Sequence, residues 1–494
     1  MTKKYIFGVD IGTQGTKTVL YDTLGNGFGS AFEPSRLIYP QSGAVEQDPD
    51  EIYGSVLRTI KCVMEKTGVD PYDIEAIGMD GQMAGMLGVD RELVPTTPLD
   101  SWLDRRCEPY IDRIKKEAED QVISLTGCPV TYAHGPKILR WKNEYPGVYG
   151  KTDKYIEPVT YAVLRMCGKK ADEAYIDYTN LHFSGFADNE KLKWSDELLA
   201  VFCVDRNKMP EIVEPYRIIG RVTEQAAREC MLVPGIPVVA GCGDQAATSL
   251  GAGVISPGEC FDGAGTASVF SVCTTGYKPD VSRKTLLFPH HVLPGLYQPM
   301  AYISGGGLCL KWFRDTVLEK KHSYKELEEE ADKILPGSDG LFFIPHFNGR
   351  TCPNDPKVKG MFWGLEFTHG KGAMFKSIME SIAFEYKMYA DILGSSKIGV
   401  VIGTGGGSAS PCFNRIKADV LGTEYRVTTR SDTATFGSAL LAGYGVGLYD
   451  DLVSAAKKLT SISAVYSPDA DRHKAYIPFA VEYATFLNKC GSLV

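Results

Sequence analysis

A short run of residues near the N-terminus combines a carboxylate with a glycine-rich turn, a combination suited to binding phosphate. Tyr5 to Val9 is apolar and β-prone, Gly12 and Gly15 interrupt it, and strand character resumes at Thr18. A glycine-rich hairpin points backbone N–H groups into a concavity that suits phosphate oxygens, while Asp10 at the strand end can hold Mg²⁺ through water. An ordinary surface hairpin with a turn-capping Asp fits these residues about equally well.

A second glycine-threonine turn makes the phosphate site the preferred interpretation. Residues 260–270 again run from apolar residues through Gly265-Thr266 and back into strand-like sequence. Gly12 and Gly265 lie 265 − 12 = 253 positions apart, about half of the chain. Two phosphate hairpins from two similar halves predict a nucleotide bound in a cleft between two related α/β domains.

The pattern of glycines and prolines predicts a domain boundary, and the glycines and small residues nearer the C-terminus predict a ligand-binding loop and a helix. The turn Ser256-Pro257-Gly258 separates a predicted domain of residues 1–255 from one of residues 256–494. The glycines of the segment 403–409 let a ligand approach the backbone closely. Residues 433–447 predict a helix of small residues that packs against this glycine loop.

A carboxylate at a strand end is a candidate for general-base chemistry. Asp244 follows the predicted strand Ile236 to Ala240 and a glycine-rich turn. Ligands of open α/β sheets bind beyond the carboxyl ends of strands, where a carboxylate can accept a proton from a substrate hydroxyl. The alternative is that Asp244 only caps the helix that follows.

The segment Leu99 to Arg106 gathers one aromatic ring, two acids and two guanidinium groups. Carboxylate and Arg side chains bond to hydroxyl groups, and Trp102 can stack on the C–H face of a sugar, so the segment predicts a polyol pocket. A helix start with a solvated charged face is the alternative. Gln82 is a polar residue in an otherwise apolar, glycine-rich turn. We interpret Lys137 as a surface lysine, and a functional role is the alternative.

Composition excludes several classes of function. The 494 residues predict two or three domains, and the formal net charge of −8 argues against nucleic acid or a membrane surface and for a small-molecule ligand. Thirteen cysteines without a CxxC pair favour reduced thiols in a cytoplasmic protein over disulfides or a zinc site. We find no signal peptide and no apolar run long enough to cross a bilayer.

Taken in order, these blocks resemble the FGGY carbohydrate kinases, in particular the xylulokinase-like members. The resemblance runs from about residue 5 to about residue 450. Each marker is weak alone, but their shared order is specific. The markers are Asp10 to Thr13, Gly81 to Met83, Trp102 to Arg106, Pro136-Lys137, Gly243-Asp244, Gly263 to Thr266, Gly360 to Glu380, Gly405 to Gly407 and Gly437.

The resemblance implies an actin-like ATPase (ribonuclease H-like) fold with two related domains around a nucleotide cleft, and ATP with Mg²⁺. It implies that Asp244 is the catalytic base and that Asp10 holds the metal. The implied ATP-binding residues are Gly12, Thr13, Gln14, Gly265, Thr266, Gly405, Gly406 and Gly407. The implied sugar-binding residues are Gln82, Met83, Trp102, Asp104, Arg105 and Asp244.

We therefore predict ATP-dependent phosphorylation of a sugar hydroxyl, on a ketopentose such as xylulose or on a related ketose or polyol. Kinases of the ribulose, fuculose, gluconate, glycerol or erythritol type are the alternatives. Xylulokinase-like members read Gly-Gln-Met-His where this chain has Ala84 after Met83, and the lost imidazole argues against D-xylulose itself. A homodimer is one option for the oligomeric state.

Two rival functions are weaker. The sequence GTGGGSA with Glu424 about twenty residues on imitates a dinucleotide fingerprint, but Ser408 replaces the third glycine and Glu424 opens the next predicted strand. A non-catalytic actin-like protein would need neither Asp244 nor the Trp102 to Arg106 cluster. A P-loop kinase is excluded because no GxxxxGK[ST] occurs.

Overall fold

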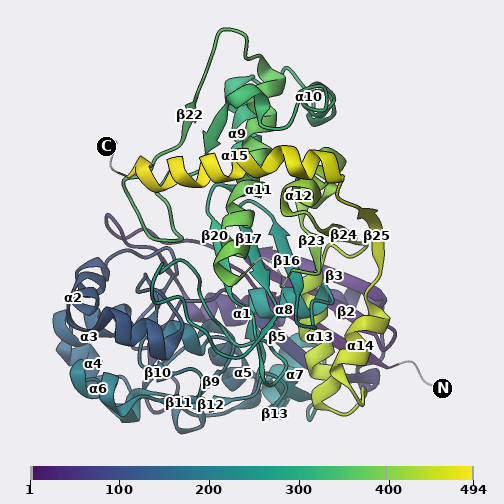
Figure 1. Cartoon of the computed structure of the whole chain (residues 1–494). Helices are drawn as coiled ribbons and strands as arrows, with labels where there is room; N and C mark the ends of the chain where they lie inside the picture. The colour runs from purple at the N-terminus through teal and green to yellow at the C-terminus, as the bar shows by residue number, and fades with distance from the viewer. Residues whose placement is uncertain (1–3, 395–397, 492–494) are drawn as a thin grey trace.

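The computed structural model describes residues 4–394 and 398–491 and contains two large sheets, each covered by helices (Figure 1). We call the first sheet and the elements packed on it the first lobe (residues 4–255 and 433–459). The second lobe comprises the second sheet and its helices (residues 256–428 and 462–491). The arrangement confirms the predicted α/β class.

The first sheet begins with the predicted hairpin. Strands β1 and β2 pair antiparallel, β3 continues the meander, and β5 and β14 lie parallel to β1 on its other side. The strand order is β13-β14-β5-β1-β2-β3, and the short β15 also pairs with β5. The strands are β1 (Tyr5–Ile11), β2 (Gly15–Asp22), β3 (Gly27–Pro34), β5 (Ile74–Gly81), β13 (Ile218–Arg221), β14 (Pro237–Val239) and β15 (Cys242–Gly243).

The second sheet repeats this plan. An antiparallel hairpin, β16–β17, is followed by β20 on one side and by parallel β23 and β24 on the other, so β20-β17-β16-β23-β24 corresponds to β3-β2-β1-β5-β14. The two glycine-rich hairpins therefore occupy equivalent positions in the two sheets. The strands are β16 (Glu259–Ala264), β17 (Ser268–Val272), β20 (Met300–Ile303), β23 (Val400–Thr404), β24 (Glu424–Thr428) and β25 (Ile462–Tyr466).

Helix α1 (Pro49–Thr67) covers the face of the first sheet over β2 and β3, and its sequence explains its ends. The Asp48 side chain accepts hydrogen bonds from the backbone N–H groups of Asp50 and Glu51, which satisfies donors that a helix start leaves free. Gly68 ends the helix in a left-handed conformation with φ of 62°. The apolar residues that recur at helical spacing are buried: Ile52, Val56, Ile60 and Val63.

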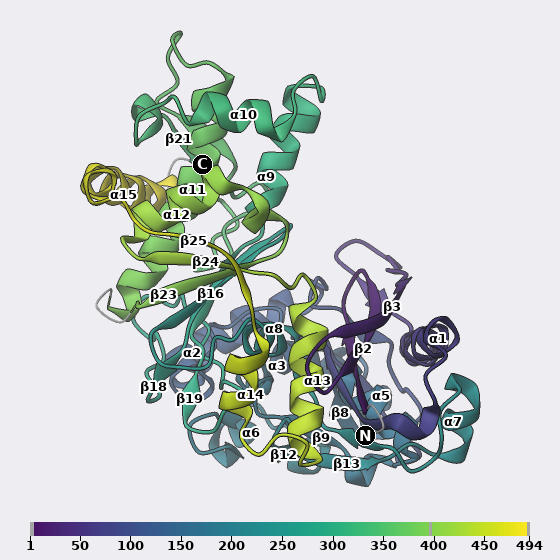
Figure 2. The same cartoon turned by 90° about the vertical axis from the view of Figure 1, so that its right-hand side faces the viewer.

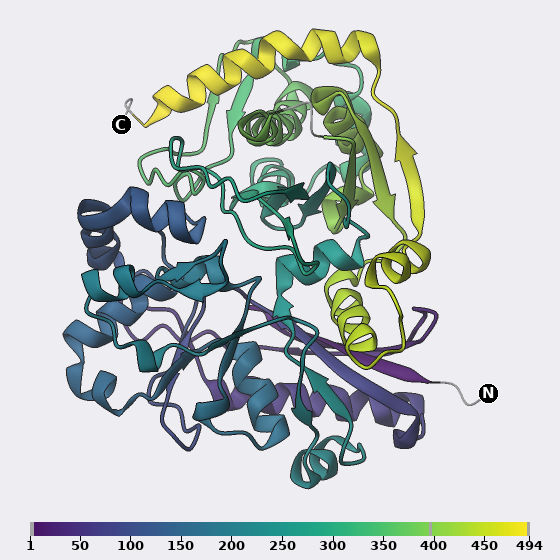
Figure 3. The same ribbon diagram turned by 60° about the horizontal axis from the view of Figure 1, so that its bottom comes forward.

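Residues 87–213 form a mostly helical extension of the first lobe with its own apolar core. Its helices lie on one side of the molecule in Figure 3. They are α2 (Glu108–Thr126), α3 (His134–Glu144), α4 (Pro146–Lys151) and α6 (Asp196–Val201), whereas α5 (Pro158–Cys167) packs in the core of the first sheet. Its short strands include β6 (Leu87–Val89), β7 (Leu99–Asp100), β8 (Lys154–Ile156), β9 (Tyr175–Asp177) and β12 (Glu211–Val213). Helices α7 (Glu224–Cys230) and α8 (Asp244–Gly251) complete this half of the chain.

In the second lobe several helices pack beside the sheet, and the buried α11 lies among them. Helix α15 forms the outer edge of this lobe (Figures 1 and 3). The helices are α9 (Gly306–Trp312), α10 (Tyr324–Ala331), α11 (Lys371–Leu393), α12 (Pro411–Leu421) and α15 (Ala470–Cys490). The predicted boundary at residues 255 and 256 falls in the loop between α8 and β16 and stays a prediction.

The small-residue helix α13 (Thr433–Gly445) crosses back to the first lobe (Figure 2). It packs on β1, β5 and α8 rather than mainly against the glycine loop at 405–407, so that prediction of its packing was wrong. Glycines make the approach possible: a Cβ on Gly8, Gly78 or Gly437 would lie within 2.0 Å of a backbone oxygen of the facing element. Helix α14 (Leu452–Leu459) follows it into the same apolar cluster.

Two predictions about compartment can be compared with the structure. No helix in residues 4–394 and 398–491 combines the length and apolarity that crossing a bilayer requires. All thirteen cysteines are free thiols, and eleven of them are buried.

The packing of α13 yields a stability prediction. Gly437→Ala should lower the free energy of unfolding by about 3 kcal/mol, because the added Cβ would lie 1.9 Å from the backbone oxygen of Ala247 in α8. Gly150→Ala in helix α4 is the matched control, since no atom lies within 4 Å of its added Cβ, and we expect it to be neutral or slightly stabilising. Urea unfolding of both variants measures the difference. Equal stability of the two would show that α13 does not depend on this close approach.

Candidate active site

Three turns meet where adjacent parallel strands of the first sheet end. In the strand register Ile11 of β1 lies opposite Gly81 of β5, and Gly81 lies opposite Gly243 of β15. The residues that follow these positions therefore come together at one edge of the sheet, where open α/β folds bind ligands. The structure thereby brings the first glycine-threonine turn, the turn carrying Gln82 and Met83, and Asp244 close together.

A chain of hydrogen bonds joins two of these turns to the Trp102 segment. The Trp102 indole N–H donates to Oγ1 of Thr13 at 2.8 Å, and the Thr13 hydroxyl donates to Oε1 of Gln82 at 3.4 Å. The Gln82 amide in turn donates to Oε1 of Gln47 at 2.7 Å. Predicted phosphate-binding and sugar-binding residues thus share one polar network. Trp102 keeps 36% of its surface exposed, which leaves its ring open to a ligand.

Asp244 is the first residue of α8 and lies beside the Gln82 turn. Gly243 makes this contact possible, since a Cβ there would come within 2.5 Å of Cε of Met83. Burial, and then the negative charge of Asp10, raise the pKa of Asp244 to about 7, against hydrogen bonds from Gln245. A carboxylate with a pKa near neutrality is suited to proton transfer. A residue that only caps a helix would not need such a pKa.

Asp10 has a second carboxylate beside it that sequence reasoning missed. Asp80 is fully buried on β5, directly opposite Asp10 in the parallel register. Its Oδ2 accepts a 2.6 Å hydrogen bond from the Ser438 hydroxyl of α13, whereas its Oδ1 is buried without a hydrogen-bond partner. Burial raises the pKa of Asp10 to about 6, and burial together with the Asp10 charge raises the pKa of Asp80 well above its usual range.

The acids and guanidinium groups around Trp102 have different environments. Asp104 is buried, and its carboxylate accepts bonds from the backbone N–H of Val45 and from the Arg106 guanidinium. Arg106 also pairs with Asp100, so this part of the segment is a buried ionic network. Arg105 is mostly exposed and contacts the Tyr132 hydroxyl at 3.3 Å. The predicted sugar contacts of Asp104 and Arg105 therefore stay predictions.

The second set of predicted ATP-binding residues gathers at the ends of β16 and β23. Gly405 has a φ of 80°, and its added Cβ would lie 2.9 Å from the backbone oxygen of Ala264, just before Gly265. A Cβ on Gly407 would lie equally close to Cβ of Ala264. The structure thus places the glycine loop directly against the second hairpin. Gln14, at the tip of the first hairpin, is exposed, and its carbonyl accepts a bond from Ser35.

A cavity of about 360 Å³ adjoins the second hairpin and was not predicted. Helix α9 forms one wall, and the backbone N–H groups of Gly307 and Leu308 donate to the carbonyls of Gly265 and Thr266. The cavity is lined by Ser304, Gly305, Leu308, Lys311, Trp312 and Phe347, among others. The signal in the sequence was the run of three glycines at 305–307 directly after a strand.

The carboxylates of the first lobe fit a divalent cation. The described residues contain no ready-made group of three or more His, Cys, Asp or Glu ligands. Mg²⁺, however, is usually held by one or two carboxylates with water and substrate phosphates. Asp10 and Asp80 supply two carboxylates whose charges have no buried cation between them, and the unpartnered Oδ1 of Asp80 is consistent with this use.

Comparison with known proteins agrees with this geometry. Models of the N-terminal and C-terminal domains of the FGGY family of carbohydrate kinases match residues 5–251 and 263–446. The chain therefore belongs to the FGGY family of carbohydrate kinases. It is an enzyme that phosphorylates a carbohydrate at the expense of ATP, as the sequence predicted.

Individual relatives differ in the substrate that their names give. A xylulose kinase of Lactococcus lactis is 28% identical over 469 residues, which cover 92% of this chain and 90% of that protein. A glycerol kinase of Thermococcus gammatolerans is 28% identical over 499 residues, 96% of each chain. The crystal structure of a gluconate kinase from Lactobacillus acidophilus matches with a TM-score of 0.92 and 24% identity over 99% of both chains. The structural match confirms the predicted actin-like ATPase fold.

The raised pKa of Asp80 gives a prediction about stability. Without Mg²⁺, stability should fall as the pH rises from 5 to 8, because the folded state retains protons that the unfolded chain has already released. Asp80→Asn should reduce this dependence and raise the free energy of unfolding at pH 8 by about 1 to 3 kcal/mol.

The contrasting control is Asp262→Asn. Asp262 is equally buried, but its carboxylate pairs with the Lys417 ammonium, so its loss should destabilise by about 3 to 5 kcal/mol. Thermal melts across the pH range compare the two variants. If Asp80→Asn destabilises the protein as Asp262→Asn does, Asp80 has a favourable partner and our account of it is wrong.

Proposed function

We propose that this protein transfers the γ-phosphoryl group of ATP, with Mg²⁺, to a hydroxyl of a ketopentose such as xylulose or of a related ketose or polyol. One observation carries the proposal: Asp244, with its raised pKa, lies beside the Gln82 turn at the strand ends that also present Asp10 and Thr13. A kinase for a ribulose, fuculose, gluconate, glycerol or erythritol type of substrate is the alternative within the same chemistry.

In the proposed mechanism Asp244 is the general base. Its carboxylate accepts the proton of the attacking hydroxyl as the new O–P bond forms in line with the bond to the leaving ADP. The proton must be absent from Asp244 beforehand, so only the ionised form is active. Gln82 and Trp102 hold the sugar, the amide through hydrogen bonds and the indole ring by stacking on its C–H face.

Phosphate binding falls to the two glycine-threonine hairpins. Backbone N–H groups at Gly12-Thr13 and Gly265-Thr266 offer donors to the phosphate oxygens from the two lobes. Mg²⁺, when bound through Asp10 and Asp80, would neutralise charge on the transferred group. Because the transition state of phosphoryl transfer is loose, catalysis depends mainly on positioning and electrostatics.

The adenosine part of ATP would lie against the second lobe. The glycine loop Gly405, Gly406 and Gly407 allows close approach of a ligand to the backbone, and the neighbouring cavity along α9 has a volume of about 360 Å³. That volume falls in the range of small-molecule pockets. Trp312 and Phe347 supply its aromatic surface, and Lys311 supplies a cation.

The cellular setting is also a proposal. We propose that the enzyme acts in the cytoplasm, supported by its thirteen unpaired cysteines. A homodimer stays a prediction that sedimentation velocity can test.

The decisive experiment measures sugar-stimulated ADP release over a panel of ketoses, polyols and aldonates. We expect at least one ketose or polyol to stimulate release, and Asp244→Asn to lower kcat by about 10² to 10⁴ while ATP binding is retained. Gln245→Ala, which alters the adjacent side chain but keeps the carboxylate, should retain far more activity. Turnover near wild type in Asp244→Asn would remove Asp244 from the mechanism, and no stimulation by any compound would refute the proposed substrate class.

A second prediction concerns position 84. Ala84 is 93% buried beside Met83, so the chain offers no imidazole to a substrate hydroxyl there. An unpaired hydroxyl costs about 1 to 3 kcal/mol, or roughly 5- to 150-fold in kcat/KM, so D-xylulose should be a poor substrate. Ala84→His should raise kcat/KM for D-xylulose and lower it for the preferred substrate.

Position 84 has an additional structural constraint. Its φ of 60° is left-handed, so Ala84→Asn, which tolerates that backbone, is the matched control for adding a polar side chain. If the wild type already uses D-xylulose efficiently and the His variant does not improve it, position 84 does not recognise the sugar.

A further inference from the structure

Lys137 is completely buried, which corrects our interpretation of it as a surface lysine. It lies in the first turns of α3, and its ammonium donates to two backbone carbonyls: Ala84 O at 2.7 Å and Ser101 O at 2.8 Å. These carbonyls belong to the two segments that carry the proposed sugar contacts, next to Met83 and Trp102. One buried cation thus joins the two halves of the proposed sugar site.

The surroundings of Lys137 show that its charge is not held there by a simple ion pair. Burial lowers its pKa, and the nearby thiol of Cys107 and the carboxylates of Asp100 and Asp104 oppose that effect. Asp100 already accepts a 2.6 Å bond from the Trp141 indole, and Asp104 bonds to Arg106. The two direct hydrogen bonds of the Lys137 ammonium go to carbonyls instead.

The carbonyl of Ala84 belongs to a strained residue. With φ of 60°, Ala84 adopts a left-handed conformation that a residue with a Cβ seldom occupies. Such a conformation persists only where the surroundings hold it in place. The hydrogen bond from the Lys137 ammonium to the Ala84 carbonyl is one contact that holds this peptide group in place.

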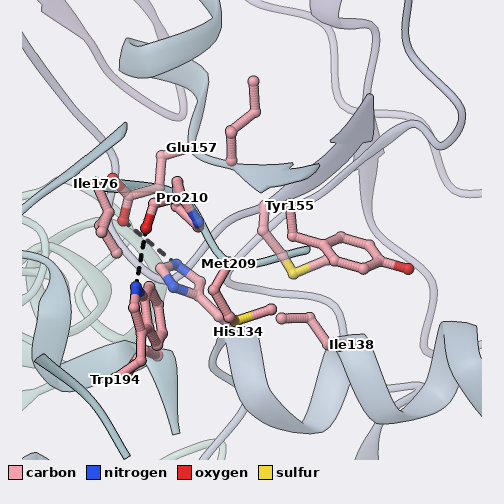
Figure 4. A pocket seen from close by; sticks show the side chains of 11 residues that line it. His134, Ile138, Tyr155, Glu157, Ile176, Trp194, Met209 and Pro210 are labelled. Atoms are coloured by element: carbon pink, nitrogen blue, oxygen red, sulfur yellow. Dashed lines mark hydrogen bonds and ion pairs between the residues drawn. The ribbon is translucent and has the colours of Figure 1, made fainter. Parts of the chain in front are cut away.

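A second residue of the same helix supports the next peptide group. The His134 imidazole donates a hydrogen bond to the backbone of Gly85, and its Nε2 lies 3.6 Å from Oε1 of Glu157 (Figure 4). Both side chains border a cavity of about 20 Å³, which is too small for a sugar. His134 therefore supports the turn from behind and is not exposed to substrate.

We propose that the first turns of α3 are a positioning device for the sugar site, in which Lys137 is the principal positioning residue and His134 assists. The Lys137 ammonium fixes the Gln82 to Ala84 turn relative to Trp102, so that both reach the same substrate hydroxyls. This inference rests on the proposed sugar site. It predicts that losing the ammonium disturbs sugar binding specifically and leaves the binding of the adenosine part of ATP to the second lobe intact.

The test compares two buried lysines of the same lobe. Lys137→Met keeps the length of the side chain but removes the donor, and Lys208→Met is the matched control. Lys208 is also buried and donates to a backbone carbonyl, that of Thr152, away from the sugar turn. For each variant we would measure Tm, KM for ATP, and kcat and KM for the best sugar of the panel.

We expect both variants to lose stability, but only Lys137→Met to raise KM for sugar, by about 10- to 100-fold, with KM for ATP within about threefold. Ala84→Gly removes the left-handed strain, so adding it to Lys137→Met should restore part of the sugar affinity. Should Lys137→Met fail to fold, Lys137→Gln, whose amide still reaches one carbonyl, is expected to raise KM to a smaller extent.

Equal sugar KM values in the Lys137 and Lys208 variants would overturn the inference, because Lys137 would then contribute to stability alone. The same holds if Lys137 variants change kcat and both KM values together. Failure of the proposed function is distinguishable, since the wild-type enzyme would then show no sugar-stimulated ADP release at all.

Discussion

The contact of α13 with β1, β5 and α8 is the constraint on which the first lobe depends. Backbone lies directly on backbone there, because Gly8, Gly78, Gly251 and Gly437 carry no side chain at the points of closest approach. This packing brings the Ser438 hydroxyl within hydrogen-bonding distance of the Asp80 carboxylate. The packing of α13 holds the acidic edge of the sheet and the start of α8 in fixed relative positions. Asp244, the first residue of α8, is positioned in the same way.

The two lobes treat buried carboxylates in opposite ways. In the second lobe Asp262 is matched by the Lys417 ammonium and by the hydroxyls of Tyr386 and Tyr425. At the equivalent edge of the first lobe, Asp10 and Asp80 lie opposite each other without a buried cation, and burial raises the pKa of both. Because Asp10 and Asp80 lack a protein counter-charge, they are suited to bind a cation that arrives with the substrate. Asp262 already has its cation and therefore has a structural role.

Local signals in the sequence predicted local features well. Glycines and threonines located both hairpins, and the strand before Asp244 located its turn. The sequence did not reveal relations set by distant partners. Asp80 became part of the site because β5 pairs with β1 in a particular register, and Lys137 became buried because α3 packs over loops 53 and 36 residues away. The glycines that seat α13 span more than four hundred positions, so its packing partner could not be read from its own composition.

The return of α13 to the first lobe also sets the order in which the chain can complete its folding during synthesis. The face of the first sheet around Gly8 and Gly78 is made within the first eighty residues, but its covering helix ends only at Gly445. Until then the nascent protein exposes an apolar sheet face, while the second sheet is being translated. The first half of the chain can therefore complete the burial of this sheet face only after α13 has been synthesised.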